Sequence, residues 1–110
     1  MRKIIVGLYG ASGFGSEVMP LLLEQSKRDF SEKIDIDHYF IDSSSEQREL
    51  NNIQIVDEDT FLSMECDEFY FNIAISDSEI RKGLAEGLMK KGCKPIDIHA
   101  STAKILQGNK

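Results

Sequence analysis

The sequence predicts an α/β domain built on a small, doubly wound parallel sheet of about five strands with flanking helices. Short apolar segments rich in β-branched residues alternate along the chain with segments whose apolar residues recur at helical spacing. A glycine-rich turn follows the first apolar segment directly. The 110 residues are 41% hydrophobic and include two prolines, which suits one folded domain rather than a disordered chain.

The first part of the chain predicts a strand, a helix and a second strand. Residues 3–9, KIIVGLY, are typical of a strand buried on both faces. Residues 16–30 have helical spacing, and Pro20 requires that the helix either begins only a few residues before it or is kinked there. Residues 34–41 alternate as a second strand, which ends in a serine-rich turn at 42–45.

The middle of the chain predicts shorter elements. Residues 46–52 are expected to form a loop or a helical turn, and residues 53–57 a short strand. A short helix follows over residues 57–64, with Asp57 or Asp59 as its N-cap.

The last part predicts a strand, a helix and a final strand. Residues 68–76 read as a buried strand, and the next helix begins at Ser76, which has capping-box spacing to Glu79. Gly92 is expected to end this helix, and residues 95–99 to form the fifth strand.

The glycine-rich loop joins the first strand to the first helix, at the carboxyl end of the predicted sheet, where doubly wound folds bind ligands. The N–H groups and the dipole of the following helix attract anions there. Its spacing, Gly-x-x-Gly-x-Gly, matches neither the dinucleotide fingerprint nor the P-loop. A phosphate site and a tight turn with close helix–strand packing both explain it. The candidate phosphate-binding residues are Gly10, Ala11, Ser12, Gly13, Phe14 and Gly15.

Two more loops are expected at the same end of the sheet. Asp42 and Ser43 follow the second strand, somewhat further from the glycines than the acidic residue that bonds a ribose hydroxyl in dinucleotide enzymes. Ile75, Ser76 and Asp77 follow the fourth strand and open a helix. The alternative explanations are a turn aspartate for Asp42 and a simple helix cap for the second loop.

Charge and composition exclude several functions. A net charge of −6, with 19 acidic and 13 basic residues, argues against nucleic-acid and anionic-membrane partners. Cys66 and Cys93 lack metal-ligand spacing and are expected to be reduced thiols in a cytoplasmic protein. His38 is expected to be structural, and His99 has no partner at catalytic spacing. The sequence therefore predicts a binding crevice with no metal site and no catalytic residues of its own.

Four motifs carry a resemblance to a known family. YGASGFG, YFIDSS, FNIAISDSEIRKGL and IHASTA resemble, in order and spacing, the bacterial nucleotide-sugar acetyltransferases of the sialic-acid O-acetyltransferase and bacillosamine-pathway N-acetyltransferase type. The resemblance covers nearly the whole chain but only the first of the family's two domains. It implies a Rossmann-like domain over residues 1–101 that binds a UDP-sugar, followed at 102–110 by the start of a linker. The absent second domain is expected to be a left-handed β-helix of hexapeptide repeats.

The resemblance also implies roles for residues and partners. The glycine loop would approach the diphosphate, with Ser12 as a hydroxyl donor, while Asp42 and Ser43 would lie near the nucleoside. Ile75, Ser76 and Asp77 would line the other wall. Acetyl-CoA, the catalytic histidine and the homotrimer interface would all belong to the absent domain, so this chain alone is expected to be an inactive monomer or weak dimer.

Two residues depart from the family's usual pattern. Phe14 stands where histidine is common, which puts a polar contact from that side chain in doubt. Ser76 stands where glycine is frequent, which could narrow the crevice.

The residues also allow two other functions. The first is the NAD(P)-binding domain of a short-chain-type oxidoreductase, although the glycine spacing is one residue short and no Tyr-x-x-x-Lys pair follows. The second is a non-catalytic interaction or regulatory domain.

Overall fold

The computed structural model describes residues 2–11 and 13–98. Strands and helices alternate along most of the chain, as predicted. The elements are β1 (Lys3–Tyr9), α1 (Gly13–Asp29), β2 (Asp35–Ile41), β3 (Glu49–Leu50), β4 (Ile53–Val56), α2 (Glu58–Leu62), β5 (Glu68–Ile73), α3 (Ser78–Lys90) and β6 (Lys94–Pro95).

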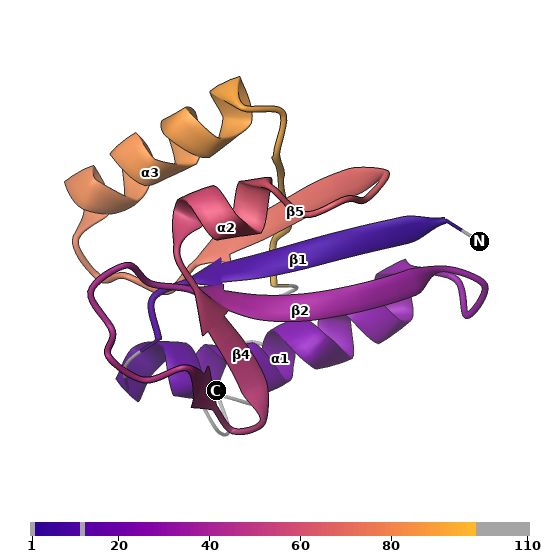
Figure 1. Ribbon diagram of the computed structural model, residues 1–110, viewed down its shortest axis with the longest axis horizontal. Helices are drawn as coiled ribbons and strands as arrows, with labels where there is room; N and C mark the ends of the chain where they lie inside the picture. Colours follow the sequence, from indigo (N-terminus) through magenta and orange to yellow (C-terminus); the bar gives the residue numbers. More distant parts are fainter. Residues whose placement is uncertain (1, 12, 99–110) are drawn as a thin grey trace.

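The strands form one six-stranded sheet in the order β3-β4-β2-β1-β5-β6. The pairs β1–β2, β1–β5, β2–β4 and β5–β6 are parallel, and only the short β3 runs antiparallel, against β4. Helix α1 covers one face of the sheet, and α2 and α3 cover the other (Figure 1). The predicted α/β, doubly wound and Rossmann-like class is therefore confirmed.

The central strand β1 supplies the core on both sides of the sheet. Ile4, Val6 and Leu8 pack in a cluster with residues of α1, whereas Ile5 packs on the opposite face with Phe61 of α2. Successive strand residues point to opposite faces, so a strand covered on both sides must be apolar at nearly every position. The continuous apolar run of this strand therefore predicted its place at the centre of the sheet.

A hairpin replaces the loop expected at residues 46–52. Glu49 and Leu50 pair with β4 in antiparallel register. The turn between them consists of Asn51 and Asn52, whose φ angles are 52° and 66°. A two-residue type I′ turn requires positive φ at both positions, and asparagine tolerates it better than most residues. The loop prediction is therefore wrong at Glu49 and Leu50.

Helix α1 begins at Gly13, about two turns before Pro20, so the expectation of a start only a few residues before the proline is wrong. Pro20 lies inside the helix and faces solvent. Proline removes one hydrogen bond of the helix, and on the exposed face water can bond to the carbonyl in its place.

The ends of the later elements also differ from the prediction. Asp77, not Ser76, caps α3: its Oδ1 accepts the N–H groups of Glu79 at 3.0 Å and Ile80 at 3.1 Å. The predicted capping box is therefore wrong, whereas Gly92 has the positive φ of 91° expected of a helix stop.

The final strand is shorter than predicted. β6 contains only Lys94 and Pro95 and lies at the edge of the sheet, so the strand predicted over residues 95–99 is wrong at 96–98. Proline has no N–H to donate, which suits an edge position and limits further pairing. His99 and the linker predicted at 102–110 lie outside the described residues.

Candidate functional site

The sheet order creates a crevice at the carboxyl end of β1. This strand lies between β2 and β5, and the chain leaves β1 towards α1 on one face but leaves β5 towards α3 on the other. Such a topological switch point is where open α/β sheets bind ligands. A pocket of about 420 Å³ lies there, and we call it the switch-point pocket. Its lining residues are Tyr9, Gly10, Phe14, Asp42, Ser43, Ser44, Ala74, Ile75 and Ser76.

The structure brings together most of the side chains predicted from three separate loops. Those that line the switch-point pocket are Gly10, Phe14, Asp42, Ser43, Ile75 and Ser76. Ala11 is buried beside the pocket, and Asp77 is engaged in capping α3. Gly13 opens α1, Gly15 is buried in its first turn, and Ser12 lies outside the described residues.

Two of the loop glycines are required by packing. Gly10 has a φ of 104°, and a Cβ there would lie 2.9 Å from the carbonyl oxygen of Ala74. A Cβ on Gly15 would overlap the carbonyl oxygen of Gly10. The tight-turn explanation therefore accounts for both positions, independently of any ligand.

The first amides of the loop are used inside the protein. The N–H of Gly10 donates to the carbonyl of Ile41 at 2.9 Å, and the N–H of Ala11 donates to Asp42 Oδ2 at 3.2 Å. An anion at this pocket would therefore meet the first turn of α1, whose N–H groups have no partner within the helix, rather than the loop before it.

Asp42 fixes the geometry between the first two loops. Its Oδ1 accepts the N–H of Ser44 at 3.0 Å and the hydroxyl of Ser44 at 2.7 Å, while its Oδ2 holds Ala11. Burial raises the pKa of this carboxyl, whereas the hydrogen bonds from Ser44 and Ala11 lower it. The lowering is the larger effect, so the pKa is below its usual value. The pocket thus has an anion-attracting end at α1 and a carboxylate that attracts hydroxyl donors.

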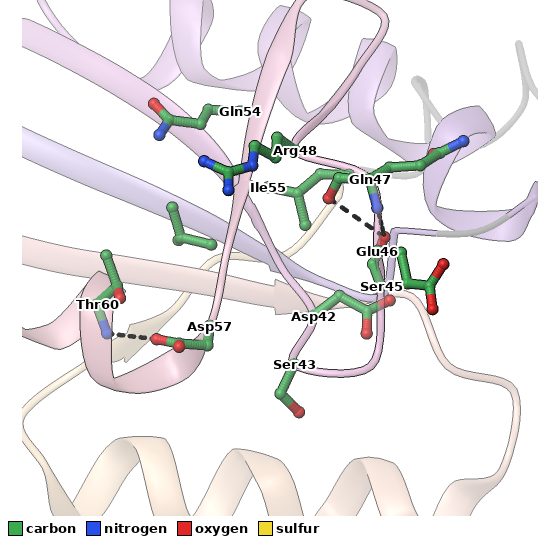
Figure 2. Close-up of a pocket in the computed structure, with 11 residues that line it drawn as sticks. Asp42, Ser43, Ser45, Glu46, Gln47, Arg48, Gln54, Ile55, Asp57 and Thr60 are labelled. Carbon is green, nitrogen blue, oxygen red and sulfur yellow. Dashed lines mark hydrogen bonds between the residues drawn. The ribbon is translucent and has the colours of Figure 1, made fainter.

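A second pocket, of about 390 Å³, adjoins the first, because Asp42 and Ser43 line both. Figure 2 shows the residues that line this second pocket. We call it the β4 pocket. The β3–β4 hairpin holds the preceding loop, residues 45–48, beside β4, because the N–H of Ile55 in β4 donates to the carbonyl of Arg48 at 2.8 Å. Its other lining residues are Ser45, Glu46, Gln47, Arg48, Gln54, Ile55, Val56, Asp57 and Thr60.

Sequence reasoning missed the β4 pocket because the pocket depends on the hairpin. The Asn51-Asn52 pair ahead of an apolar strand was the available signal, since this pair suits a two-residue turn. Because the hairpin was not predicted, the sequence could not indicate that residues 45–48 lie beside β4.

The remaining titratable groups have structural surroundings. His38 Nε2 lies 2.9 Å from Ser26 Oγ against α1, and burial lowers the pKa of His38 to about 4. Cys66 and Cys93 are free thiols, and burial raises the pKa of each. Among residues 2–11 and 13–98, no group of three or more His, Cys, Asp or Glu side chains could hold a metal ion. In the same residues, no helix has the length and hydropathy needed to span a bilayer.

The sheet order and the pocket at its switch point define a class of protein: a Rossmann-like α/β domain with a ligand-sized crevice at the carboxyl end of its strands. The chain belongs to the PglD N-terminal domain family, whose pattern matches residues 4–88.

Two relatives agree with this membership. GDP-perosamine N-acetyltransferase of Escherichia coli O157:H7 is 29% identical over 94 residues, which are 86% of this chain and 42% of that protein. The solved structure of WeeI from Acinetobacter baumannii AYE has a TM-score of 0.77 and 34% identity, covering 89% of this chain and 44% of that one. The chain thus spans less than half the length of either relative.

The resemblance drawn from the four sequence motifs, to the N-terminal domain of nucleotide-sugar acetyltransferases, is confirmed. The alternative of a short-chain-type oxidoreductase is not favoured.

Proposed function

We propose that this domain binds a nucleoside-diphosphate sugar in the switch-point pocket and orients the sugar for acetyl transfer. The observation that carries the proposal is the pairing of an anion-attracting helix start with a fixed carboxylate in one pocket. A nucleotide sugar carries both complementary features, since its diphosphate is anionic and its ribose hydroxyls are hydrogen-bond donors.

The pocket residues divide between the parts of such a ligand. The first turn of α1 faces the diphosphate, with the Ser12 hydroxyl as the predicted additional donor. Asp42 and Ser43 face the ribose. Ile75 and Ser76 form the opposite wall, and Phe14, whose exposed fraction is 49%, adds an aromatic surface beside the diphosphate.

The reaction itself belongs to the whole protein. In it, the amino or hydroxyl group of the sugar attacks the thioester carbonyl of acetyl-CoA, a histidine beyond Lys110 accepts the proton, and coenzyme A leaves as its thiol. Acetyl-CoA, the histidine and the contacts of a cytoplasmic homotrimer are assigned to a left-handed β-helix that would follow residues 102–110. This domain contributes orientation, which lowers the entropic part of the barrier, and catalyses nothing alone.

The isolated chain should bind weakly. Hydrogen bonds to a charged group contribute roughly 1.5–3 kcal/mol each, while association costs about 4–15 kcal/mol. The amides of Gly10 and Ala11 already have internal partners, so fewer donors remain for a diphosphate. A Kd from about the high micromolar to the millimolar range follows.

An NMR titration of the ¹⁵N-labelled chain tests the proposal. The resemblance predicts uridine as the nucleoside and one relative is named for a guanosine nucleotide, so both UDP and GDP are added. We expect the amide signals of Gly10, Phe14, Ser43 and Ser76 to move together. NADH is the third ligand, and shifts with NADH alone would revive the oxidoreductase alternative.

A matched pair of variants locates the binding. Ser76→Phe fills the switch-point pocket, whereas Ser78→Phe places the same side chain on the exposed start of α3, outside the lining residues. We expect only Ser76→Phe to abolish the shifts. Equal binding by both variants, or no shifts in the unmodified chain, would contradict the proposal.

A further inference from the structure

We propose that the β4 pocket binds the nucleobase of the ligand and selects guanine, with Asp57 and Arg48 as the residues that read its edge. This inference rests on the proposed function, because the β4 pocket shares Asp42 and Ser43 with the switch-point pocket. A ligand whose ribose lies at these two residues has its diphosphate in one pocket and its base in the other.

The β4 pocket has the shape and surface that a base requires. Ile55 and Val56, each 8% exposed, provide a small apolar floor at the end of β4. Polar side chains of the hairpin and of α2 surround this floor. A planar aromatic base buries its face on apolar atoms and directs its edge to polar groups, as most ligands do in protein pockets.

Opposite charges line this pocket without pairing. Arg48 and Asp57 both face the pocket, and neither forms an ion pair with any residue in the described part of the chain. The carboxylates of Asp42 and Glu46 also line this pocket, so one cation and three carboxylates surround it. A ligand edge with both hydrogen-bond donors and acceptors can bond to such a lining. Figure 2 shows Asp57 beside Thr60, on the opposite side of Asp42 from Glu46.

Apart from Asp42, which is assigned to the ribose, the pocket has the carboxylates of Glu46 and Asp57, and Asp57 is the better positioned of these two. Its Oδ1 accepts the N–H of Thr60 at 2.7 Å as the N-cap of α2, which fixes the side chain in place. Both residues are exposed, but Glu46 has the longer side chain, and its carboxylate accepts no hydrogen bond within the described part of the chain. A carboxylate whose position is fixed recognises an edge with less loss of side-chain entropy.

The chemistry of the pair favours guanine. An ionised carboxylate only accepts hydrogen bonds, and guanine presents two adjacent donors, N1–H and the 2-amino group. Arginine is the common partner of the guanine O6 and N7 acceptors. Uracil offers a single N–H between two carbonyl oxygens, so a carboxylate at its edge gains one bond and meets a repelling oxygen.

Three nucleoside diphosphates test this inference on the 110-residue chain. Inosine diphosphate differs from GDP only in lacking the 2-amino group, and UDP lacks the purine ring. NMR titrations should give GDP a Kd roughly tenfold lower than that of either other ligand, the size expected for one well-formed base contact.

Variants assign the discrimination to the two residues. Asp57→Asn keeps the N-cap, because asparagine caps as well as aspartate, and should bring the Kd ratio of inosine diphosphate to GDP close to one. Glu49→Gln removes the same charge from the exposed β3 outside the pocket and should leave the ratio unchanged. Arg48→Met should weaken GDP and inosine diphosphate alike, since both have O6 and N7, and affect UDP little.

The outcomes separate this inference from the proposed function. Equal affinities for GDP, inosine diphosphate and UDP, tighter binding of UDP, or a ratio that survives Asp57→Asn would overturn guanine selection while nucleotide binding stands. The absence of any shift at Gly10 or Ser43 with all three ligands would instead remove the proposed function itself. A ¹H–¹⁵N spectrum of each variant confirms its fold, and Arg48→Met supplies an independent test if Asp57→Asn is unstable.

Discussion

The two ends of the sheet treat their charged groups differently. At the amino end, Lys3 pairs with Asp35 and Asp37, and Glu68 pairs with both Arg2 and Lys94. The carboxyl end has two adjoining pockets, in which Arg48 and Asp57 form no ion pair within the described part of the chain.

The difference agrees with the proposal that ligand binding is confined to the carboxyl end, while the ion pairs of the amino end stabilise the fold. Hydrogen bonds with Asp37 and Asp35 hold the pKa of Lys3 above its usual value, so that amine is fully charged and committed to its partners. At the carboxyl end, Asp42 and Asp57 accept hydrogen bonds from N–H groups of the chain but form no ion pair within the described residues, whereas Glu58 beside them pairs with Lys91. Mutations at the amino end should therefore change stability alone, whereas most at the carboxyl end should change binding.

The largest expected effect is on stability and comes from the carboxyl end, because Gly15 there is required by packing. Gly15→Ala should lower the free energy of unfolding by about 3 kcal/mol, since its Cβ overlaps the Gly10 carbonyl and the backbone must shift. Urea denaturation measures the loss. Gly83→Ala in α3, where no atom lies within 4 Å of the added Cβ, should instead stabilise by roughly 0.5–1 kcal/mol. A Gly15→Ala chain as stable as the parent would refute the packing explanation.

The interior between the two ends should respond to acid. Burial lowers the pKa of His38 to about 4 from an ordinary 6.5. Between these two pH values, His38 is protonated in the unfolded chain but neutral in the folded chain. Stability attributed to His38 is complete above pH 6.5 and falls as the pH decreases towards 4. Between about pH 7 and pH 5 the loss should be about 2 kcal/mol. His38→Gln should remove this part of the pH dependence, and an unchanged slope would contradict the assignment.

Asp42 sharpens the comparison at the carboxyl end. If its carboxylate accepts a ribose hydroxyl, Asp42→Asn should raise the Kd for GDP about tenfold, because a hydrogen bond to a charged group is lost. The 2′- and 3′-deoxy analogues of GDP identify the hydroxyl, since the Kd of the analogue that lacks it should be insensitive to the substitution. Tighter binding of GDP by the variant would show that the carboxylate repels the diphosphate instead.

The smallest effect is expected at the amino end. Lys3→Met removes the ion pairs with Asp35 and Asp37, and exposed pairs of this kind contribute within about 1 kcal/mol. Thermal unfolding should show a slight decrease that disappears in high salt. The Kd for GDP should not change, and a change would mean that the two ends of the sheet are coupled.

The strand–helix alternation and the long apolar segments of the sequence predicted the fold well. The apolar run of β1 predicted that strand with its correct bounds, because burial on both faces requires apolar residues at nearly every position. Asp42 and Ser43 line one pocket together with Gly10 and Phe14 of the glycine loop, since loops after parallel strands share one end of a sheet.

Short or tertiary features could not be predicted in this way. A two-residue strand such as β3 is too short to show an alternating pattern. Its pairing could be predicted only from the Asn51-Asn52 turn, and the β4 pocket depends on that pairing. Ser76 and Asp77 are adjacent and both suit an N-cap, and only the backbone geometry decides between them. The packing roles of Gly10 and Gly15 depend on carbonyl oxygens elsewhere in the fold.

The asparagine turn places one wall of the β4 pocket at the margin of the sheet, away from the central strand. Residues 45–48 can therefore diverge without disturbing the hydrophobic interior that stabilises the domain. If the β4 pocket binds the base as proposed, related chains with the same central strands would change nucleotide preference by altering a few positions in the loop before β3.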